Sequence, residues 1–339
     1  MRPCAGAAGV DAKPSFAAFE AAYIAGQPQV LWARMIADLE TPVSAMIKLV
    51  GGAANSFLLE SVEGGSIRRR YSFLGLKPDL IWRCHGNRAE INRHALDDPA
   101  AFQPCPVSED AGTLVSFRAV LAESRIDLPA GLPPMAAGLF GYLGYDAVRL
   151  AEDIPDANPK CLDVPDGQFL RPTIITVFDT IEDLVTVVTP VWQVDGVSAD
   201  RAYQAGLSRL AKVLDDFDQS LAHTAGDQTR QFGEPRSNMT EAEFCAIVEK
   251  GKEYILAGDV FQVVLSQQFS MPFDLPPLAF YRALRRINPS HSCFSWISGI
   301  FPSSGPAPNC WSACAPGASP SGPWPAPAGA ASTTPRIAA

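Results

Sequence analysis

The stretch from Leu170 to Val191 constrains the fold most, because two apolar runs flank a polar turn. Leu170–Phe178 and Leu184–Val191 are rich in β-branched residues, and Asp179–Asp183 between them is mostly polar. Short apolar and β-branched runs on both sides of a turn are typical of neighbouring strands. The stretch therefore predicts a strand pair near the middle of the chain.

Apolar stretches in the first hundred residues alternate with polar ones and predict more strands. These stretches are 45–50, 56–62, 71–76, 80–84 and 88–92. Helices are expected at Thr113–Ser124, Asp200–Phe217 and Thr240–Leu256, whereas residues 15–38 are expected to be helix or loop. Many strands with helices set apart from them favour an α+β fold over a wound parallel sheet. We expect an antiparallel-sheet sandwich with flanking helices.

Charge and composition exclude several classes of protein. The formal net charge is −9 and the pI is about 5.0, so the chain lacks the basic surface that nucleic-acid binding needs. No apolar run approaches the ~20 residues of a membrane span, and the N-terminus lacks the apolar stretch of a secretory signal. The eight cysteines show no Cys-x-x-Cys spacing, which favours reduced thiols in the cytoplasm. No histidine lies at metal-ligand spacing from another ligand, so no metal site is expected within the chain.

Residues 257–267, Ala-Gly-Asp-Val-Phe-Gln-Val-Val-Leu-Ser-Gln, narrow the function most. A Gly-Asp turn leads into Val260–Leu265, a β-branched and aromatic run that predicts a buried strand. Gln262 is an amide inside that run, and a buried amide must find hydrogen-bond partners. The backbone can supply them, in which case Gln262 is structural; a role in a reaction is the other interpretation. The segment closely resembles the start of the chorismate-binding domain in anthranilate synthase component I.

Three more segments carry the same resemblance, in the order that the family has. Phe57–Glu63 contains Leu-Leu-Glu-Ser and precedes Arg70–Gly75, Gly138–Asp146 is rich in glycine and aromatic residues, and Ile287–Ser290 has the sequence Ile-Asn-Pro-Ser. The resemblance runs from about Ser15 to Ser290. Four motifs in family order are a specific signal, whereas any one of them alone is weak.

The resemblance implies a lyase of tryptophan biosynthesis. Anthranilate synthase adds ammonia to chorismate, displaces the ring hydroxyl and eliminates pyruvate to leave anthranilate. Mg²⁺ holds the ring carboxylate of chorismate, and a separate glutaminase subunit, component II, supplies ammonia from glutamine. Related enzymes that add water have a Lys at the position of Gln262, where it acts as general base. A neutral Gln suits an enzyme whose nucleophile is already ammonia, so Gln262 is the candidate catalytic residue.

The resemblance also implies a pocket for L-tryptophan as feedback inhibitor. Its candidate residues come from two segments and are Leu59, Glu60, Ser61, Asn288, Pro289 and Ser290. Glu60 would face the ligand ammonium and Ser61 would hydrogen-bond it, while one of Arg68, Arg69 and Arg70 would balance the ligand carboxylate. The alternative is a strand edge with a solvated carboxylate and hydroxyl, and three arginines on a solvated face.

The resemblance stops at residues 291–339. This segment contains one charged side chain, Arg336, together with nine prolines, three of the six tryptophans and three of the eight cysteines. Such a composition is typical of neither a packed domain nor a solvated tail. A disordered Pro/Ala/Gly linker is one interpretation.

Out-of-frame translation is the interpretation that we favour for residues 291–339. In the shifted frame, each codon consists of the third base of one codon and the first two bases of the next. The codons of Trp296 and Ile297 then allow only Asp, and those of Trp311 and Ser312, with the usual serine codon, give Val. The permitted reading around them includes Phe-Leu-Asp-Phe-Gly and Ser-Ser-Pro-Glu-Leu-Leu-Val, which closely resembles what the family has after Asn-Pro-Ser.

The sequence therefore predicts four regions. Residues 15–190 form an N-terminal regulatory region, 191–236 a helix and linker, 237–290 the start of the chorismate-binding domain, and 291–339 the out-of-frame tail. The family's magnesium-ligating glutamates and catalytic histidine belong after this break, so the second half of the fold is expected to be incomplete and the chain inactive as it stands. Two alternatives stay open: 4-amino-4-deoxychorismate synthase component I, and a non-catalytic tryptophan- or subunit-binding module.

Overall fold

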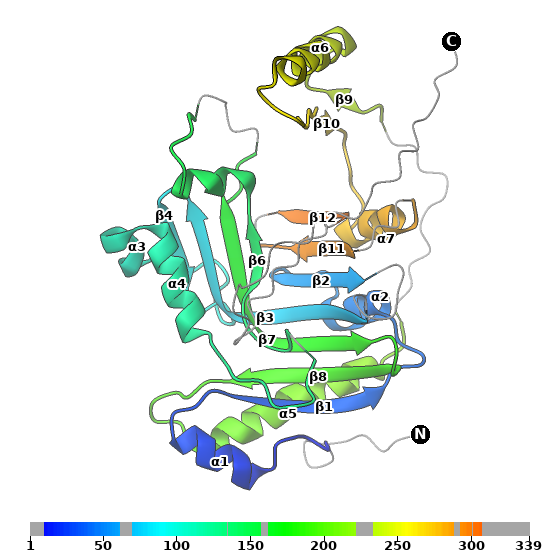
Figure 1. Ribbon diagram of the computed structural model, residues 1–339. Coiled ribbons are helices and arrows are strands. Elements are labelled where there is room, and N and C mark those ends of the chain that lie inside the picture. The colour runs from blue at the N-terminus through cyan, green and yellow to red at the C-terminus, as the bar shows by residue number, and fades with distance from the viewer. Residues whose placement is uncertain are drawn as a thin grey trace.

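The computed structural model describes residues 10–61, 70–133, 135–156, 162–221, 233–287, 292–299 and 301–306. Its main feature is a ten-stranded sheet with the strand order β1-β8-β7-β3-β2-β11-β12, to which β4, β5 and β6 are attached (Figure 1). Neighbouring strands are antiparallel throughout. The strands are β1 Gln29–Ile36, β2 Ser56–Ser61, β3 Tyr71–His85, β4 Arg88–Asn92, β5 Gln103–Pro104, β6 Phe140–Leu143, β7 Gly167–Asp179, β8 Leu184–Val191, β11 Ser292–Ile297 and β12 Pro302–Pro306. The expected α+β class is confirmed.

The strand pair predicted in the middle of the chain is β7 and β8, which turn at residues 180–183. Two of the predicted strands, 71–76 and 80–84, form the single long strand β3. The register between β3 and β7 shifts between Pro78 and Leu80, and Lys77 beside it has a positive φ of 52°. Such a bulge bends a strand, and in Figure 1 β4 and β6 run across the direction of β1 and β8. The ten strands thus form one bent antiparallel sheet in the described part of the chain.

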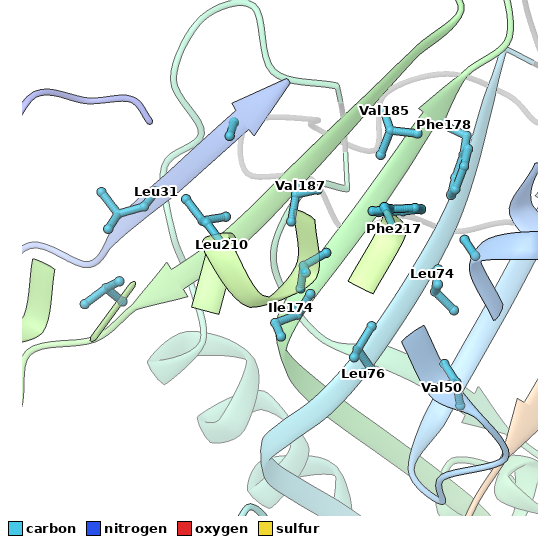
Figure 2. Packing of buried hydrophobic residues seen from close by; sticks show 14 of the residues in the cluster. Leu31, Val50, Leu74, Leu76, Ile174, Phe178, Val185, Val187, Leu210 and Phe217 are labelled. Atoms are coloured by element: carbon cyan, nitrogen blue, oxygen red, sulfur yellow. The ribbon is translucent and has the colours of Figure 1, made fainter. Parts of the chain in front are cut away.

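Helices α1 (Phe16–Ile24) and α5 (Ala199–Phe217) cover one face of the sheet (Figure 1). Ser198 caps α5 by accepting a hydrogen bond from the backbone N–H of Arg201, as an N-cap serine does. Figure 2 shows apolar side chains of α5, such as Leu210 and Phe217, packed against side chains of the strands. Burial of this apolar surface is the main stabilising term for the fold.

The opposite face of the sheet holds a second cluster, in which Phe57 stacks between Phe140 and Trp296. Short helices α3 (Pro106–Ala111) and α4 (Thr113–Glu123) cover the far end of β3 and β4, where Trp82 donates a hydrogen bond from Nε1 to Ser116 Oγ over 2.9 Å. A 3-10 helix, η3, spans Tyr145–Leu150. Both faces of the sheet are thus packed.

Two helices follow residue 236. Helix α6 (Glu241–Ala257) is capped by Thr240, whose side chain forms a reciprocal capping box with Glu243. It stands apart from the large sheet in Figure 1, beside the two-stranded sheet of β9 (Arg236–Ser237) and β10 (Phe269–Ser270). Helix α7 (Pro277–Ile287) lies instead next to β11 and β12.

Two expectations near the N-terminus are wrong. Residues 29–36, expected to be helix or loop, form β1, which pairs along its whole length with β8. Residues 45–50, expected to be a strand, end the helix α2 (Pro42–Ala45) and form the π-helical turn η2 (Met46–Val50). Thr41 caps this helix, Pro42 occupies its first turn, and Gly51 ends η2 in the left-handed conformation. These local signals outweigh the apolar pattern.

The segment expected to be out of frame contributes two strands to the large sheet. Strand β11 pairs with β2, and β12 pairs with β11. Phe294 and Trp296 pack in the second cluster. Residues 292–306 are thus packed where they are described, which differs from the expectation drawn from their composition. Residues 307–339 lie outside the described residues, and the out-of-frame interpretation stays a prediction.

No helix among the described residues is long and apolar enough to span a lipid bilayer.

Candidate functional site

The candidate site is centred on Glu60, near the end of β2. This strand lies between β3 and β11, and Glu60 is opposite Cys293 of β11. Successive side chains of a strand point to opposite faces; Leu58 packs in the cluster with α5, whereas Leu59 packs against the cluster on the other face. Glu60 shares the face of Leu58 and is only 3% exposed. A carboxylate so buried needs charged or hydrogen-bonding partners.

Helix α7 supplies both partners of the Glu60 carboxylate. Tyr281 donates a hydrogen bond from its hydroxyl to Oε2 over 2.6 Å, and Arg285 donates from Nη2 to Oε1 over 2.7 Å. The two residues are four positions apart, so they lie on one face of the helix. Burial, and then the negative charge of Glu60, raise the pKa of Tyr281 well above its usual range. Tyr281 is therefore a neutral donor at any physiological pH.

The cluster of Glu60, Tyr281 and Arg285, here called the Glu60 cluster, is polar within an apolar junction. The Glu60 side chain is 2% exposed, whereas that of Arg285 is 36% exposed and reaches the surface. Among the described residues, the buried Nε of Arg285 has no hydrogen-bond partner. The Glu60 carboxylate therefore pairs with Arg285, whose guanidinium still has a nitrogen without a hydrogen-bond partner among the described residues. The same carboxylate has the charge and burial to hold the ammonium group of an amino acid.

One of the two segments that were predicted to form the tryptophan pocket lies on β2, and the structure describes the elements that flank the other. Leu59 and Glu60 lie on β2, and Ser61 ends that strand opposite Ser292 of β11. The predicted residues at 288–290 lie outside the described residues. The elements on either side of them, α7 and β11, both adjoin β2 at Glu60. The location of the predicted residues in this pocket stays a prediction.

Sequence reasoning missed Tyr281 and Arg285. Helix α7 is strongly amphipathic. Tyr281 and Arg285, four positions apart on its inner face, are the signal that the sequence offered. What the pattern could not show is their partner, because Glu60 is 221 residues away from Tyr281.

Gln262 is not in a buried strand, contrary to the expectation. It is exposed, within a segment that has no regular secondary structure. Val263 and Leu265 of this segment lie over Gly251 of α6, where a Cβ on the glycine would be 3.1 Å from Val263. A strand forms only with a hydrogen-bonded neighbour, and no described strand pairs with residues 260–265. The apolar pattern therefore has no sheet to join.

Arg70 is not free to bind a ligand carboxylate. Its Nε donates to both carboxylate oxygens of Asp179, over 2.7 and 2.8 Å, and its Nη2 forms an ion pair with Glu182. The hydrogen bonds that Arg70 donates to Asp179 raise the pKa of Arg70 above its usual value. Arg70 thus fastens the turn between β7 and β8. The other two candidate arginines lie outside the described residues.

A metal does not fit the residues that the structure describes. These contain no group of three or more His, Cys, Asp or Glu side chains that could hold a metal ion. A hollow of about 370 Å³ lies near η3, but its Arg149 is paired with Asp146 and Asp156. The Mg²⁺ that the resemblance implies therefore has no ligand set in the described part of the chain.

Comparison with known proteins identifies similar chains. A family model described as chorismate binding enzyme matches residues 63–307. Anthranilate synthase component 1 of Cereibacter sphaeroides is 49% identical over 295 residues, which is 87% of this chain and 58% of that protein. The component 1 protein of Pseudomonas putida is 34% identical over 286 residues, 80% of this chain and 54% of that protein. The chain thus spans little more than half the length of these relatives.

A solved structure shares the fold. Anthranilate synthase component I from Streptococcus pneumoniae TIGR4 superposes with a TM-score of 0.52 at 23% identity, covering 76% of this chain and 53% of that one. At this identity the likeness supports the fold alone. It agrees with the α+β architecture of the described residues.

Proposed function

Because the chain belongs to the chorismate binding enzyme family, we propose that it is the regulatory region and the start of the chorismate-binding domain of an anthranilate synthase large subunit. The component 1 proteins of Cereibacter sphaeroides and Pseudomonas putida, both anthranilate synthases, support this choice within the family. The observation that carries the proposal in the structure is the buried Glu60 beneath α7. A buried carboxylate at the junction of two regions is suited to recognise a cationic ligand and to report its binding.

The whole enzyme would convert chorismate and ammonia into anthranilate and pyruvate. The name component 1 suggests a second component, which we propose to be a glutaminase subunit that supplies the ammonia, and we place both in the cytoplasm. Mg²⁺ would bind ligands in the part of the family enzyme that this chain does not cover. Gln262 would face the substrate only when that part is present. This chain alone would therefore bind and regulate, and would not turn over substrate.

L-Tryptophan is the ligand that we propose for the Glu60 cluster. Glu60 would hold its ammonium group and Ser61 would hydrogen-bond it, with residues 288–290 closing the pocket from the side of α7. Tyr281 and Arg285 would hold the carboxylate of Glu60 in place by their two hydrogen bonds. Because both donors belong to α7, ligand binding in the pocket would affect the start of the chorismate-binding domain, which contains this helix.

A chimera tests the proposal. Residues 1–290 of this chain would be joined to the part of the Cereibacter sphaeroides relative that follows the counterpart of Ser290. We expect the chimera to form anthranilate and pyruvate from chorismate, Mg²⁺ and excess ammonium, and L-tryptophan to inhibit it. Ammonium replaces the glutaminase subunit, so a missing partner cannot explain a blank.

The product separates the candidate functions. Accumulation of 4-amino-4-deoxychorismate without pyruvate would favour the sister synthase instead. A chimera that is folded and binds L-tryptophan, but forms neither product, would favour a non-catalytic binding module. The relatives' names favour the first outcome, since both are anthranilate synthases.

A further inference from the structure

The Glu60 cluster places an anion and a cation side by side. Arg285 Nη2 and Glu60 Oε1 are 2.7 Å apart, and the Glu60 side chain is 2% exposed. An α-amino acid also carries a cation and an anion side by side, because one carbon joins its ammonium and carboxylate groups. The charges of the cluster therefore complement both charged groups of an amino acid, and not its ammonium group alone.

Arg285 has hydrogen-bond donors to spare for a ligand. A guanidinium has five N–H donors, and the buried Nε of Arg285 has no hydrogen-bond partner among the described residues. The side chain is 36% exposed, so part of the guanidinium reaches the surface. Guanidinium groups bind carboxylates through charge-assisted and frequently bidentate hydrogen bonds. Arg285 can therefore bind a second carboxylate while it stays paired with Glu60.

The arginine that the sequence offered as partner of the ligand carboxylate is engaged elsewhere. Arg70 donates hydrogen bonds to Asp179 and forms an ion pair with Glu182. The other two arginines of that run lie outside the described residues. Arg285 is instead in direct contact with Glu60, the proposed partner of the ligand ammonium.

Charge balance at Glu60 favours a zwitterion over a simple amine. A bound ammonium group would add a second cation beside the Glu60 carboxylate, next to Arg285. An unpaired charge is costly in a buried site, because water does not solvate it there. The carboxylate of an amino acid removes this cost, since it pairs with the guanidinium while the ammonium pairs with Glu60. An amine without a carboxylate leaves one positive charge without a partner.

We propose that Arg285 binds the α-carboxylate of the ligand and makes the pocket select amino acids over amines. Glu60 would bind the ammonium group, and Tyr281 would keep the Glu60 carboxylate in position. Leu58 and Cys293, the neighbours of Glu60 on this face of the sheet, belong to the apolar cluster that α5 covers. These neighbours suit a ligand with an apolar side chain. The inference rests on the proposed function, because its ligand is L-tryptophan.

Calorimetric titration of the full 339-residue chain tests the proposal. Three ligands that share the indole ring separate the two charges: L-tryptophan has both, tryptamine lacks the carboxylate, and indole-3-propionate lacks the ammonium. We expect L-tryptophan to bind at least about tenfold more tightly than either of the other two. Equal affinities for L-tryptophan and tryptamine would overturn the proposal, and this comparison needs no substitution in the chain.

The variant Arg285→Gln assigns the preference to its residue. It should weaken the binding of L-tryptophan at least about tenfold, whereas tryptamine should bind as tightly as before or more tightly, because the competing cation is gone. Arg285→Lys keeps the charge but loses the planar fork, so it should retain part of the preference. Arg286→Gln is the matched control, since Arg286 is the next residue of α7 and is exposed. The control should bind all three ligands as the parent does.

The outcomes separate this inference from the proposed function. Equal weakening of L-tryptophan and tryptamine in Arg285→Gln, with an unchanged urea midpoint, would indicate a structural role for Arg285 and overturn the inference alone. If Arg285→Gln does not fold, the same comparison in Arg285→Lys decides, and a preference as strong as in the parent would overturn the inference. Absence of L-tryptophan binding to the parent would remove this ligand from the proposed function, and the inference would fall with it.

Discussion

Removal of the Glu60 carboxylate should destabilise the chain more than removal of an ordinary surface carboxylate. In the variant Glu60→Ala, the hydroxyl of Tyr281 keeps its buried position, 1% exposed, but loses its acceptor. Arg285 also loses its partner, yet its side chain is 36% exposed and can turn to water. The lost hydrogen bond at Tyr281 therefore costs the fold more than the lost ion pair at Arg285.

The magnitude follows from these positions. A buried hydroxyl left without an acceptor costs about 1–3 kcal/mol, and loss of one buried methylene costs about 0.8 kcal/mol. The half-exposed ion pair with Arg285 adds at most ~1 kcal/mol. We expect Glu60→Ala to lower the free energy of unfolding by about 3 kcal/mol. Glu60→Gln keeps an acceptor of the same shape and should cost about 1 kcal/mol.

Urea unfolding followed by tryptophan fluorescence measures these differences. Glu90→Ala is the matched control, because Glu90 also lies on a strand and pairs with Arg83 at 2.7 Å, but its side chain is 37% exposed. The control should lose less than about 1 kcal/mol. Tyr281→Phe combined with Glu60→Ala should cost less than the sum of the two single changes, because the pair is in direct contact.

Equal losses for Glu60→Ala and Glu90→Ala would refute this reasoning. So would strict additivity of the Glu60 and Tyr281 variants. Either result would mean that the hydrogen bonds from α7 contribute no more than a solvated ion pair, and Tyr281 would then not position the carboxylate.

Three further predictions concern the sheet, the ligand pocket and the gene. Burial raises the pKa of Asp179, but hydrogen bonds from Arg70 outweigh burial, so the pKa lies below its usual value. The Asp179 carboxylate therefore stabilises the fold fully above its unfolded-state pKa of about 3.9. That stabilisation is lost as the pH falls toward the lower pKa of the folded state. In a pH titration, the urea concentration at the unfolding midpoint should fall less steeply below pH 4 for Asp179→Asn than for the parent. Parallel curves for the variant and the parent would contradict this prediction. In the chimera, Ser61→Phe should raise the L-tryptophan concentration for half inhibition at least about tenfold while uninhibited turnover stays within about twofold; unchanged inhibition would remove Ser61 from the pocket. Resequencing near the codon of His291 should show that one inserted or deleted nucleotide restores the family's magnesium-ligating glutamates and catalytic histidine, and their absence from every frame would exclude the out-of-frame interpretation.

Local signals in the sequence predicted a large part of the fold. The β-branched runs around residues 179–183 form β7 and β8, and the expected helix at Thr240–Leu256 is α6. These features depend on neighbours in the chain, so their pattern is sufficient. The turn at Met46–Val50 shows the limit, because capping residues on both sides decide between two structures that one apolar pattern permits.

Long-range contacts explain the rest. Glu60 was a candidate from its motif, but its burial depends on Tyr281 and Arg285, more than 220 residues later. Val260–Leu265 has the composition of a strand, yet the composition does not provide a neighbour for it. The same pattern would be a buried strand in one context and an open edge in another. The site could therefore be predicted only as far as β2.

Anthranilate fluorescence tests most directly the central proposal that the chain carries the regulatory region of an anthranilate synthase and that the reaction needs the part of the relatives that this chain does not cover. The purified 339-residue chain and the chimera would be incubated at equal concentration with chorismate, Mg²⁺ and excess ammonium. We predict turnover by the chimera and none above buffer by the chain, because positioning and charge stabilisation supply most of the rate. Turnover by the chain within about tenfold of the chimera, a difference of only 1.4 kcal/mol in the barrier, would contradict the account.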